Sequence, residues 1–201
     1  MIEHLKPHYA AVLRPVLRLF VVCGVHPNHI TLFGLLLFSA SGWYAATGRW
    51  RVALVLVIAG ACADGWDGLL AREYNQGTPF GAVLDSTVDR LTEIVLLAGL
   101  CWYYLSGVVA DVWGVMGVVA AVTASLMVSY VKARAEGAGY ICTGGILQRP
   151  ERIIVLCFGL VFGAGFSVAG VACMTILLWG MAMVGYLTVV QRLVQVQKTP
   201  R

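Results

Sequence analysis

The sequence predicts an all-α polytopic membrane protein with six transmembrane helices, preceded by an amphipathic helix at the membrane surface. Sixty per cent of its 201 residues are hydrophobic, only 12% are charged, and the mean hydropathy is +0.83. Soluble domains carry roughly 25% charged residues, so this composition disfavours a water-soluble fold. At roughly 20 residues per span, the chain has room for about six helices with short loops. We therefore expect residues 1–201 to form a single membrane domain.

Residues 1–25 are expected to form a juxtamembrane helix that lies along the membrane surface. Apolar side chains recur in this segment at helical spacing. They are Leu5, Tyr9, Val12, Val16, Leu19 and Phe20. Lys6, Arg14 and Arg18 interrupt the apolar positions, and no small-residue cleavage site follows. The segment is therefore not expected to be a secretory signal.

Apolar runs separated by turn-forming or charged residues place six spans within residues 26–192. The predicted spans are 29–47, 52–72, 81–105, 112–135, 152–167 and 169–191. The segment His26-Pro27-Asn28 breaks the chain before the first span. The boundary between the last two spans, at Gly163 to Ser167, is the least marked in the sequence.

The distribution of basic residues predicts that both termini are cytoplasmic. With the N-terminus inside, every basic residue from Arg72 onward lies on the cytoplasmic side, and only Arg49 and Arg51 lie outside. Every acidic residue except Asp111 also lies on the cytoplasmic side, which is the first indication of a site there. The net charge of +4 is spread over helix ends and loops, which favours membrane lipid over nucleic acid as a partner.

Four acidic residues interrupt the otherwise apolar second and third spans. Asp64 and Asp67 stand near the end of the second span, and Asp85 and Asp89 near the start of the third. At 100° per residue, each pair lies on one helical face. Antiparallel pairing of the two spans places Asp64 at the depth of Asp89. It likewise places Asp67 at the depth of Asp85, so all four carboxylates are expected to meet in one pocket.

These acids require positive partners, because a central intramembrane acid costs on the order of 2.5–3.5 kcal/mol on insertion scales. Arg72 and Arg90 can neutralise at most two of the charges, whereas one or two divalent cations can neutralise all four. Oxygen-only ligands favour Mg²⁺, Mn²⁺ or Ca²⁺ over zinc. Metal ions facing a diphosphate act as Lewis acids, so phosphoryl transfer is the predicted chemistry. Acids that pair with basic residues or face a wet loop are the alternative.

Residues 64–89 match the pattern D-x2-D-G-x2-A-R-x8-G-x3-D-x3-D at all eight fixed positions, and the chain therefore resembles the CDP-alcohol phosphotransferase family. The resemblance implies a site for two Mg²⁺ or Mn²⁺ ions. Its ligands would be Asp64, Asp67, Asp85 and Asp89. The resemblance also implies that Asp89 is the general base that deprotonates the acceptor hydroxyl.

The same resemblance implies a site for the CDP group of a CDP-diacylglycerol donor. The residues that would line it are Gly68, Ala71, Arg72 and Gly81. The segment from Pro27 to Thr31 is similar to the family's lead-in to its first span, which implies that Asn28 and Thr31 contact the nucleotide. The lipid tails would lie between helices, with the diphosphate at the membrane interface.

Basic residues at the ends of the fourth, fifth and sixth spans form a second candidate site. Lys132, Arg152 and Arg192 come from three helix ends, an arrangement that can enclose an anionic group. From the residues alone, positive-inside bias and headgroup contact explain this cluster equally well. The segments K-A-R-A-E and R-P-E-R are similar to those of prokaryotic phosphatidylinositol phosphate synthases. This similarity implies that the three side chains bind the phosphate of inositol 1-phosphate, supported by Arg134 and Glu136.

The resemblances together imply a homodimeric enzyme of the prokaryotic cytoplasmic membrane that joins inositol 1-phosphate to CDP-diacylglycerol and releases CMP. Thr92 and Glu93 depart from the Ser-Asp pair that relatives often carry, and the 137–148 loop lacks acidic residues. A phosphatidylglycerophosphate synthase that uses glycerol 3-phosphate is therefore an alternative. A divalent-cation transporter is an alternative of another class, although acids confined to one membrane face speak against an ion pathway.

Overall fold

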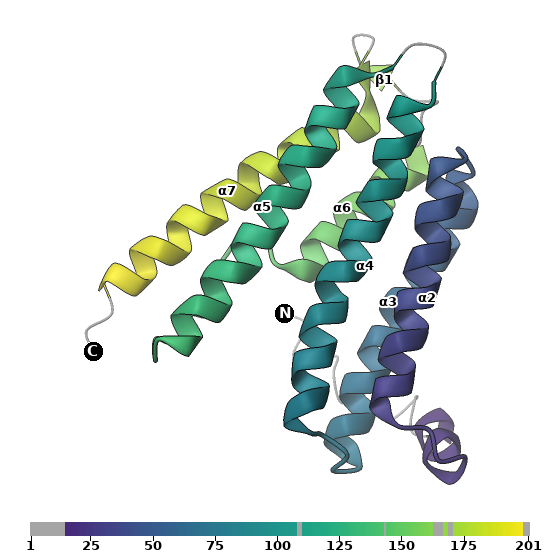
Figure 1. Cartoon of the computed structure of the whole chain (residues 1–201), viewed down its shortest axis with the longest axis vertical. Coiled ribbons are helices and arrows are strands. Elements are labelled where there is room, and N and C mark those ends of the chain that lie inside the picture. The colour runs from purple at the N-terminus through teal and green to yellow at the C-terminus, as the bar shows by residue number, and fades with distance from the viewer. Residues whose placement is uncertain (1–14, 108–109, 143, 163–166, 169–170, 199–201) are drawn as a thin grey trace.

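The computed structural model describes residues 15–107, 110–142, 144–162, 167–168 and 171–198 (Figure 1). Its long helices are α2 (Pro27–Ala46), α3 (Trp50–Glu73), α4 (Pro79–Leu105), α5 (Val112–Gly137), α6 (Arg149–Phe162) and α7 (Cys173–Lys198). Residues 15–22 are also helical. Two short strands, β1 (Ser167–Val168) and β2 (Val171–Ala172), form an antiparallel hairpin before α7. Apart from this hairpin the described chain is helical, as the sequence predicts.

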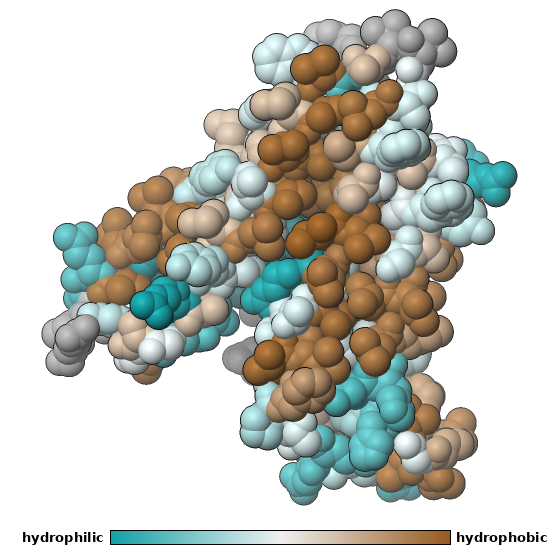
Figure 2. Space-filling view, viewed as in Figure 1, coloured by the Kyte–Doolittle hydropathy of each residue, from teal (hydrophilic) through white to brown (hydrophobic). Residues whose placement is uncertain are grey.

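Four of the described helices, α2, α3, α5 and α7, are long and apolar enough to cross a membrane. These four helices support the prediction of a membrane protein with several spans. Helix α4 has 27 residues but carries charged side chains in its N-terminal half, and α6 has 14 residues, so the count of six spans stays a prediction. Figure 2 shows hydrophobic residues over the middle of the visible face, whereas hydrophilic residues gather mainly toward the lower ends of the helices.

Capping side chains explain where two of the helices begin. Thr78 precedes α4, and its Oγ1 accepts a hydrogen bond from the backbone N–H of Gly81 at 2.9 Å. Asp111 precedes α5, and its Oδ1 accepts from the backbone N–H of Gly114 at 3.0 Å. Each bond satisfies a donor that the first turn of a helix leaves free. Pro79 in the first turn of α4 fits because its missing N–H would have no helical partner there.

The predicted boundary between the last two spans is wrong. The sequence places a span at 152–167 and another at 169–191, whereas α6 ends at Phe162 and α7 begins only at Cys173. The β1–β2 hairpin lies where the two predicted spans meet. Short apolar segments fit a strand or a buried helix equally well, so hydropathy could not distinguish them.

The helices pack in two groups, which are connected by the contact of α4 with α5 and by α6. Helix α2 packs against α3 and α4, α5 packs against α7, and α6 packs against both α3 and α7. In Figure 1 the lower parts of α5 and α7 diverge from those of α2, α3 and α4. The main core lies between these elements. Its largest fully buried side chains include Phe38, Leu96, Leu97, Leu100, Leu156, Leu160, Met174 and Leu178.

The described part of the N-terminal helix is attached to α2 and α3 by a smaller core. Leu17 is fully buried there against Ile30, Ala63 and Leu70. Residues 1–14 of the predicted interfacial helix lie outside the described residues. The amphipathic helix at the membrane surface therefore stays a prediction.

The backbones of α2 and α4 touch where two glycines meet. A Cβ atom at Gly99 would lie 2.0 Å from the carbonyl oxygen of Gly42. A Cβ atom at Gly42 would lie 2.6 Å from the carbonyl oxygen of Val95. Small residues permit such close approach between membrane helices. This contact fixes the position of α4, which carries two of the predicted metal ligands.

We expect Gly99→Ala to destabilise the protein, because the new methyl group would overlap the backbone of α2 and force the helices apart. Overpacking of this kind typically costs about 1–3 kcal/mol. Gly180→Ala on α7 is the matched control, because no atom lies within 4 Å of a Cβ built there. Thermal unfolding of the purified protein in detergent should show a lower Tm for Gly99→Ala and an unchanged or slightly higher Tm for Gly180→Ala. Equal Tm values for the two variants would contradict the close contact.

Candidate active site

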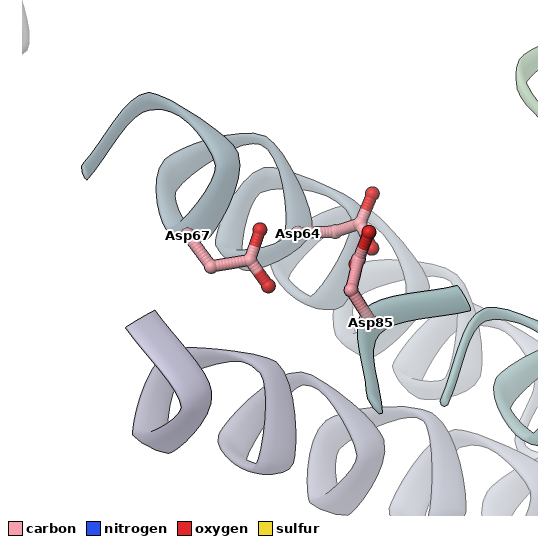
Figure 3. A group of neighbouring side chains, drawn as sticks. All are labelled: Asp64, Asp67 and Asp85. Carbon is pink, nitrogen blue, oxygen red and sulfur yellow. The ribbon is translucent and has the colours of Figure 1, made fainter. Parts of the chain in front are cut away.

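Helices α3 and α4 bring three of the predicted metal ligands together. One carboxylate oxygen from each of Asp64, Asp67 and Asp85 lies within 4.8 Å of the other two. Figure 3 shows the three carboxylates converging between the helices. Carboxylates at this separation repel one another unless a cation lies between them, and an oxygen-only donor set suits Mg²⁺ or Mn²⁺. These residues therefore fit a divalent metal.

A hydrogen bond from α2 holds one of these carboxylates in place. Thr31 Oγ1 donates to Asp67 Oδ2 at 2.5 Å. The Asp67 residue is 4% exposed and Thr31 is 5% exposed, so the bond is shielded from solvent. Thr31, which the resemblance assigns to the nucleotide, is thus also a partner of a predicted metal ligand.

The fourth predicted ligand, Asp89, lies outside this group of three and is linked to Asp64 through Arg149 at the start of α6. Arg149 Nη1 lies 2.6 Å from Asp64 Oδ2 and 2.8 Å from Asp89 Oδ1. The contact with Asp64 is a hydrogen bond, whereas the contact with Asp89 is an ion pair without hydrogen-bond geometry. Asp89 Oδ1 is buried and has no hydrogen-bond partner among the described residues. The guanidinium thus neutralises part of the charge that a metal would otherwise neutralise.

The sequence alone placed Arg149 only on the cytoplasmic side and did not assign it to the site. Arg149 and Asp64 are 85 positions apart in the chain, and they meet because α6 packs against α3. The available signal was the segment R-P-E-R, which sets Arg149 and Arg152 three positions apart at the start of one helix. Residues at this spacing lie on the same helical face.

A cavity of about 200 Å³ lies on one side of the aspartates. Asp67 and Asp85 line it. Its lining also includes all six residues that the resemblance assigns to CDP, namely Asn28, Thr31, Gly68, Ala71, Arg72 and Gly81. A Cβ atom at Gly81 would lie 3.1 Å from Asn28 Oδ1, so a larger residue would crowd this wall of the cavity. We call this space the donor cavity.

A second cavity, of about 180 Å³, is lined by Asp89 and Arg149. Lys132, Arg152 and Arg192, the residues assigned to the acceptor phosphate, line it as well. We call this space the acceptor cavity. The described lining does not include Arg134, which is exposed on α5. The structure therefore brings together three of the four basic residues predicted for this site and leaves the fourth outside.

The basic groups of the acceptor cavity are held in different ways. Arg192 is 4% exposed, its Nε donates to the carbonyl oxygen of Gly144 at 2.8 Å, and its Nη1 donates to that of Val128. Arg152 is also 4% exposed. The Lys132 side chain is 46% exposed, and its Nζ lies 3.8 Å from Glu136 Oε1. The three residues assigned to the acceptor phosphate are thus two fixed, buried arginines and one exposed lysine, and Arg90 and Arg149 line the cavity beside them.

Residues 24–193 match the family model described as CDP-alcohol phosphatidyltransferase. The chain belongs to the CDP-alcohol phosphatidyltransferase family. The phosphatidylinositol phosphate synthase of Corynebacterium glutamicum is 37% identical to it over 191 residues, covering 94% of this chain and 85% of that protein. The phosphatidylinositol phosphate synthase of Mycobacteroides abscessus is 34% identical over 201 residues, covering 96% and 86%. An uncharacterised protein of Aquifex aeolicus is 40% identical over 161 residues, covering 80% and 81%.

Solved structures of a Mycobacterium tuberculosis phosphatidylinositol phosphate synthase share the fold of this phosphatidyltransferase. The structure with CDP-DAG bound superposes with a TM-score of 0.82 at 30% identity, covering 92% of this chain and 94% of that one. The structure in complex with manganese and citrate has the same TM-score and identity, covering 92% and 89%. The family membership implied by the aspartate motif is thereby confirmed.

We expect Arg149→Gln to destabilise the metal-free protein, because Asp64 and Asp89 would lose their shared positive partner. Removing one member of a largely buried ion pair is costly, and with the partial exposure of Arg149 we expect a loss of roughly 1–3 kcal/mol. Thermal unfolding in EDTA should show this loss, and Mn²⁺ should reduce it by supplying another positive charge.

Arg51→Gln is the control for that experiment, because Arg51 is exposed at the other end of α3. It should leave Tm unchanged with and without Mn²⁺. If Arg149→Gln lowered Tm equally in EDTA and in Mn²⁺, the guanidinium and the metal would not be neutralising the same carboxylates.

Proposed function

We propose that this phosphatidyltransferase transfers the phosphatidyl group of CDP-diacylglycerol to inositol 1-phosphate, giving phosphatidylinositol phosphate and CMP. The observation that carries the proposal is that each of the two cavities is lined by members of the same group of four predicted aspartate ligands. Asp67 and Asp85 line the donor cavity, whereas Asp89 lines the acceptor cavity with five basic residues, among them Lys132, Arg152 and Arg192. The names of the curated relatives and the CDP-DAG bound to a solved homologue support the same reaction.

The aspartates are proposed to hold one or two Mg²⁺ or Mn²⁺ ions, and manganese is present in one solved homologue. When bound, such ions supply Lewis-acid stabilisation of charge on the phosphoryl oxygens and on the leaving group. The proposed ligands are Asp64, Asp67 and Asp85, whose carboxylate oxygens lie within 4.8 Å of one another, with Asp89 as the fourth. Thr31 orients Asp67 through its hydrogen bond.

The transfer is proposed to begin with the acceptor hydroxyl in the acceptor cavity, beside Asp89. Asp89 accepts the hydroxyl proton, and the hydroxyl oxygen forms a bond to the phosphorus that carries diacylglycerol. The bond between that phosphorus and the CMP oxygen breaks, and CMP leaves from the donor cavity. Lys132, Arg152 and Arg192 hold the phosphate already present on the acceptor.

The proposed topology has six spans, α2 to α7, with both termini and the active site on the cytoplasmic side of a prokaryotic membrane. Helix α4 has 27 residues, and at 1.5 Å per residue it is about 40 Å long, enough to span. Its charged residues do not exclude it, because Asp89 and Glu93 pair with arginines of α6 and need not face lipid. We also propose a homodimer, by likeness to the family.

Phosphatidylglycerophosphate synthase activity remains the alternative, because glycerol 3-phosphate would present a phosphate to the same three basic groups. The divalent-cation transporter loses its support, because the chain belongs to a family of transferases. The acceptor therefore has to be identified by assay.

We expect purified protein to release CMP from CDP-diacylglycerol in Mg²⁺ with inositol 1-phosphate as the preferred acceptor. Its kcat/KM should exceed that of glycerol 3-phosphate by tenfold or more. It should exceed that of free inositol by about 10²-fold or more, because free inositol brings no phosphate to complete the hydrogen bonding of the buried arginines. A chelator should abolish release, and Mn²⁺ should restore it. Equal kcat/KM values for the two phosphorylated acceptors would reject the proposed acceptor.

We expect Asp89→Asn to lower kcat by about 10²–10⁴-fold, because an amide cannot take up the hydroxyl proton. Binding of CDP-diacylglycerol should change little, since Asp89 faces the acceptor cavity. Steady-state kinetics and a separate nucleotide-binding measurement distinguish these effects. Glu151→Gln, an exposed acid on α6, is the control and should retain full activity. Substantial turnover by Asp89→Asn would show that another group is the base.

A further inference from the structure

Glu93 is the most deeply buried acidic residue among those described, with 2% of its surface exposed. It lies on α4, one helical turn beyond Asp89. Its carboxylate accepts hydrogen bonds from Arg152 Nε at 2.9 and 3.2 Å and from Ser125 Oγ at 2.7 Å. Three helices, α4, α5 and α6, therefore meet at one buried carboxylate.

These bonds fix the orientation of Arg152. Its Nε points to Glu93, and its Nη1 donates to the carbonyl oxygen of Leu147 at 3.2 Å. Among the described residues no hydrogen-bond partner is found for Nη2. Because Arg152 lines the acceptor cavity, the edge of the guanidinium that carries Nη2 is the one left for a ligand. One side of the guanidinium is held by protein while the other side is available to an anion.

Stability alone gives no reason for this arrangement. A buried ion pair recovers little more than the cost of removing its charges from water, and apolar residues in its place are often as stable. The acids that pair with the neighbouring Arg149 belong to the predicted metal site, but Glu93 has no such second task. Its described contacts all serve to hold Arg152.

We propose that Glu93 is a positioning residue that acts through Arg152, with Ser125 holding its carboxylate, to place Nη2 against the phosphate of the acceptor. This inference rests on the proposed function for the identity of the anion. Glu93 would then have two opposite effects on anion binding: it orients Arg152, which favours binding, and its negative charge repels the anion, which opposes binding. As a negative charge near the cavity, Glu93 by itself weakens anion binding, so any gain in affinity that it provides must come from orientation.

Because the two effects oppose each other, the direction in which Glu93→Gln changes the KM for the acceptor shows which of them is larger. If charge dominated, removing it would tighten acceptor binding. If positioning dominates, as proposed, the KM for inositol 1-phosphate rises tenfold or more while the KM for CDP-diacylglycerol stays within twofold. Ser125→Ala retains both charges and loosens the carboxylate, so the acceptor KM rises by a smaller factor, about two- to fivefold. Glu151→Gln, exposed on the same helix as Arg152, changes neither KM.

A double-mutant cycle tests whether Glu93 acts through Arg152. In an Arg152→Gln background, Glu93→Gln should cause no further rise in the acceptor KM, because the group it positions is gone. The proposal would be overturned if the effects of the two substitutions on the acceptor KM were additive. It would also be overturned if Glu93→Gln lowered the acceptor KM or changed both KM values equally. Should Glu93→Gln fail to fold, Ser125→Ala carries the test alone, and an unchanged acceptor KM in that variant would likewise overturn it.

A binding measurement separates this inference from the proposed reaction. Inorganic phosphate and inositol 1-phosphate should each raise the Tm of the wild-type protein, and the rise should be smaller in Glu93→Gln and in Ser125→Ala. If the wild type released no CMP with inositol 1-phosphate yet showed this pattern of protection, the proposed acceptor would fail and the positioning role would stand. Equal protection of wild type and both variants would overturn the positioning role whatever the reaction.

Discussion

The fold and the site depend on gathering carboxylates at one end of a hydrophobic helix bundle and supplying positive charge to them. Asp64, Asp67 and Asp85 lie within 4.8 Å of one another, a separation that is unfavourable without a cation. Much of the surrounding structure serves this cluster. The glycine contact holds α4 against α2, the cap at Thr78 fixes where α4 begins, and Thr31 orients Asp67. Each of these details limits how far the carboxylates can move apart.

Helix α6 links the two halves of the site through its two arginines. Arg149 reaches the aspartates, whereas Arg152, three positions later, reaches Glu93. Asp89 and Glu93 lie four positions apart on α4, so their ion pairs with the two arginines lie one helical turn apart between α4 and α6. The acids that Arg149 contacts are proposed metal ligands, whereas Glu93 is not. The start of α6 therefore contacts the proposed metal site through Arg149 and a separate buried carboxylate through Arg152.

The sequence predicted features that depend on local chemistry. Hydropathy located α2 to α5 to within two residues, and helical periodicity put the aspartates on facing sides of α3 and α4. It could not place the two short strands before α7, because apolar residues there suit a strand as well as a helix. Nor could it assign Arg149 or Glu93, whose partners lie 85 and 59 positions away. Arg134 was assigned to the acceptor site but does not line the described cavity, because a basic residue two positions from Lys132 need not lie on the same face of the helix.

The state of the two buried arginines explains why such a site would favour a phosphorylated acceptor over water. Arg152 and Arg192 each use Nε and Nη1 for bonds to the protein, so neither can turn to find new partners. An acceptor that brings a phosphate completes their hydrogen bonding. A water molecule or an uncharged polyol leaves Arg192, whose described partners are carbonyl oxygens, without an anion. Because Asp89 lines the same cavity, the binding energy of the phosphate would also bring the hydroxyl to the proposed base, and transfer to the acceptor would be favoured over hydrolysis of the donor.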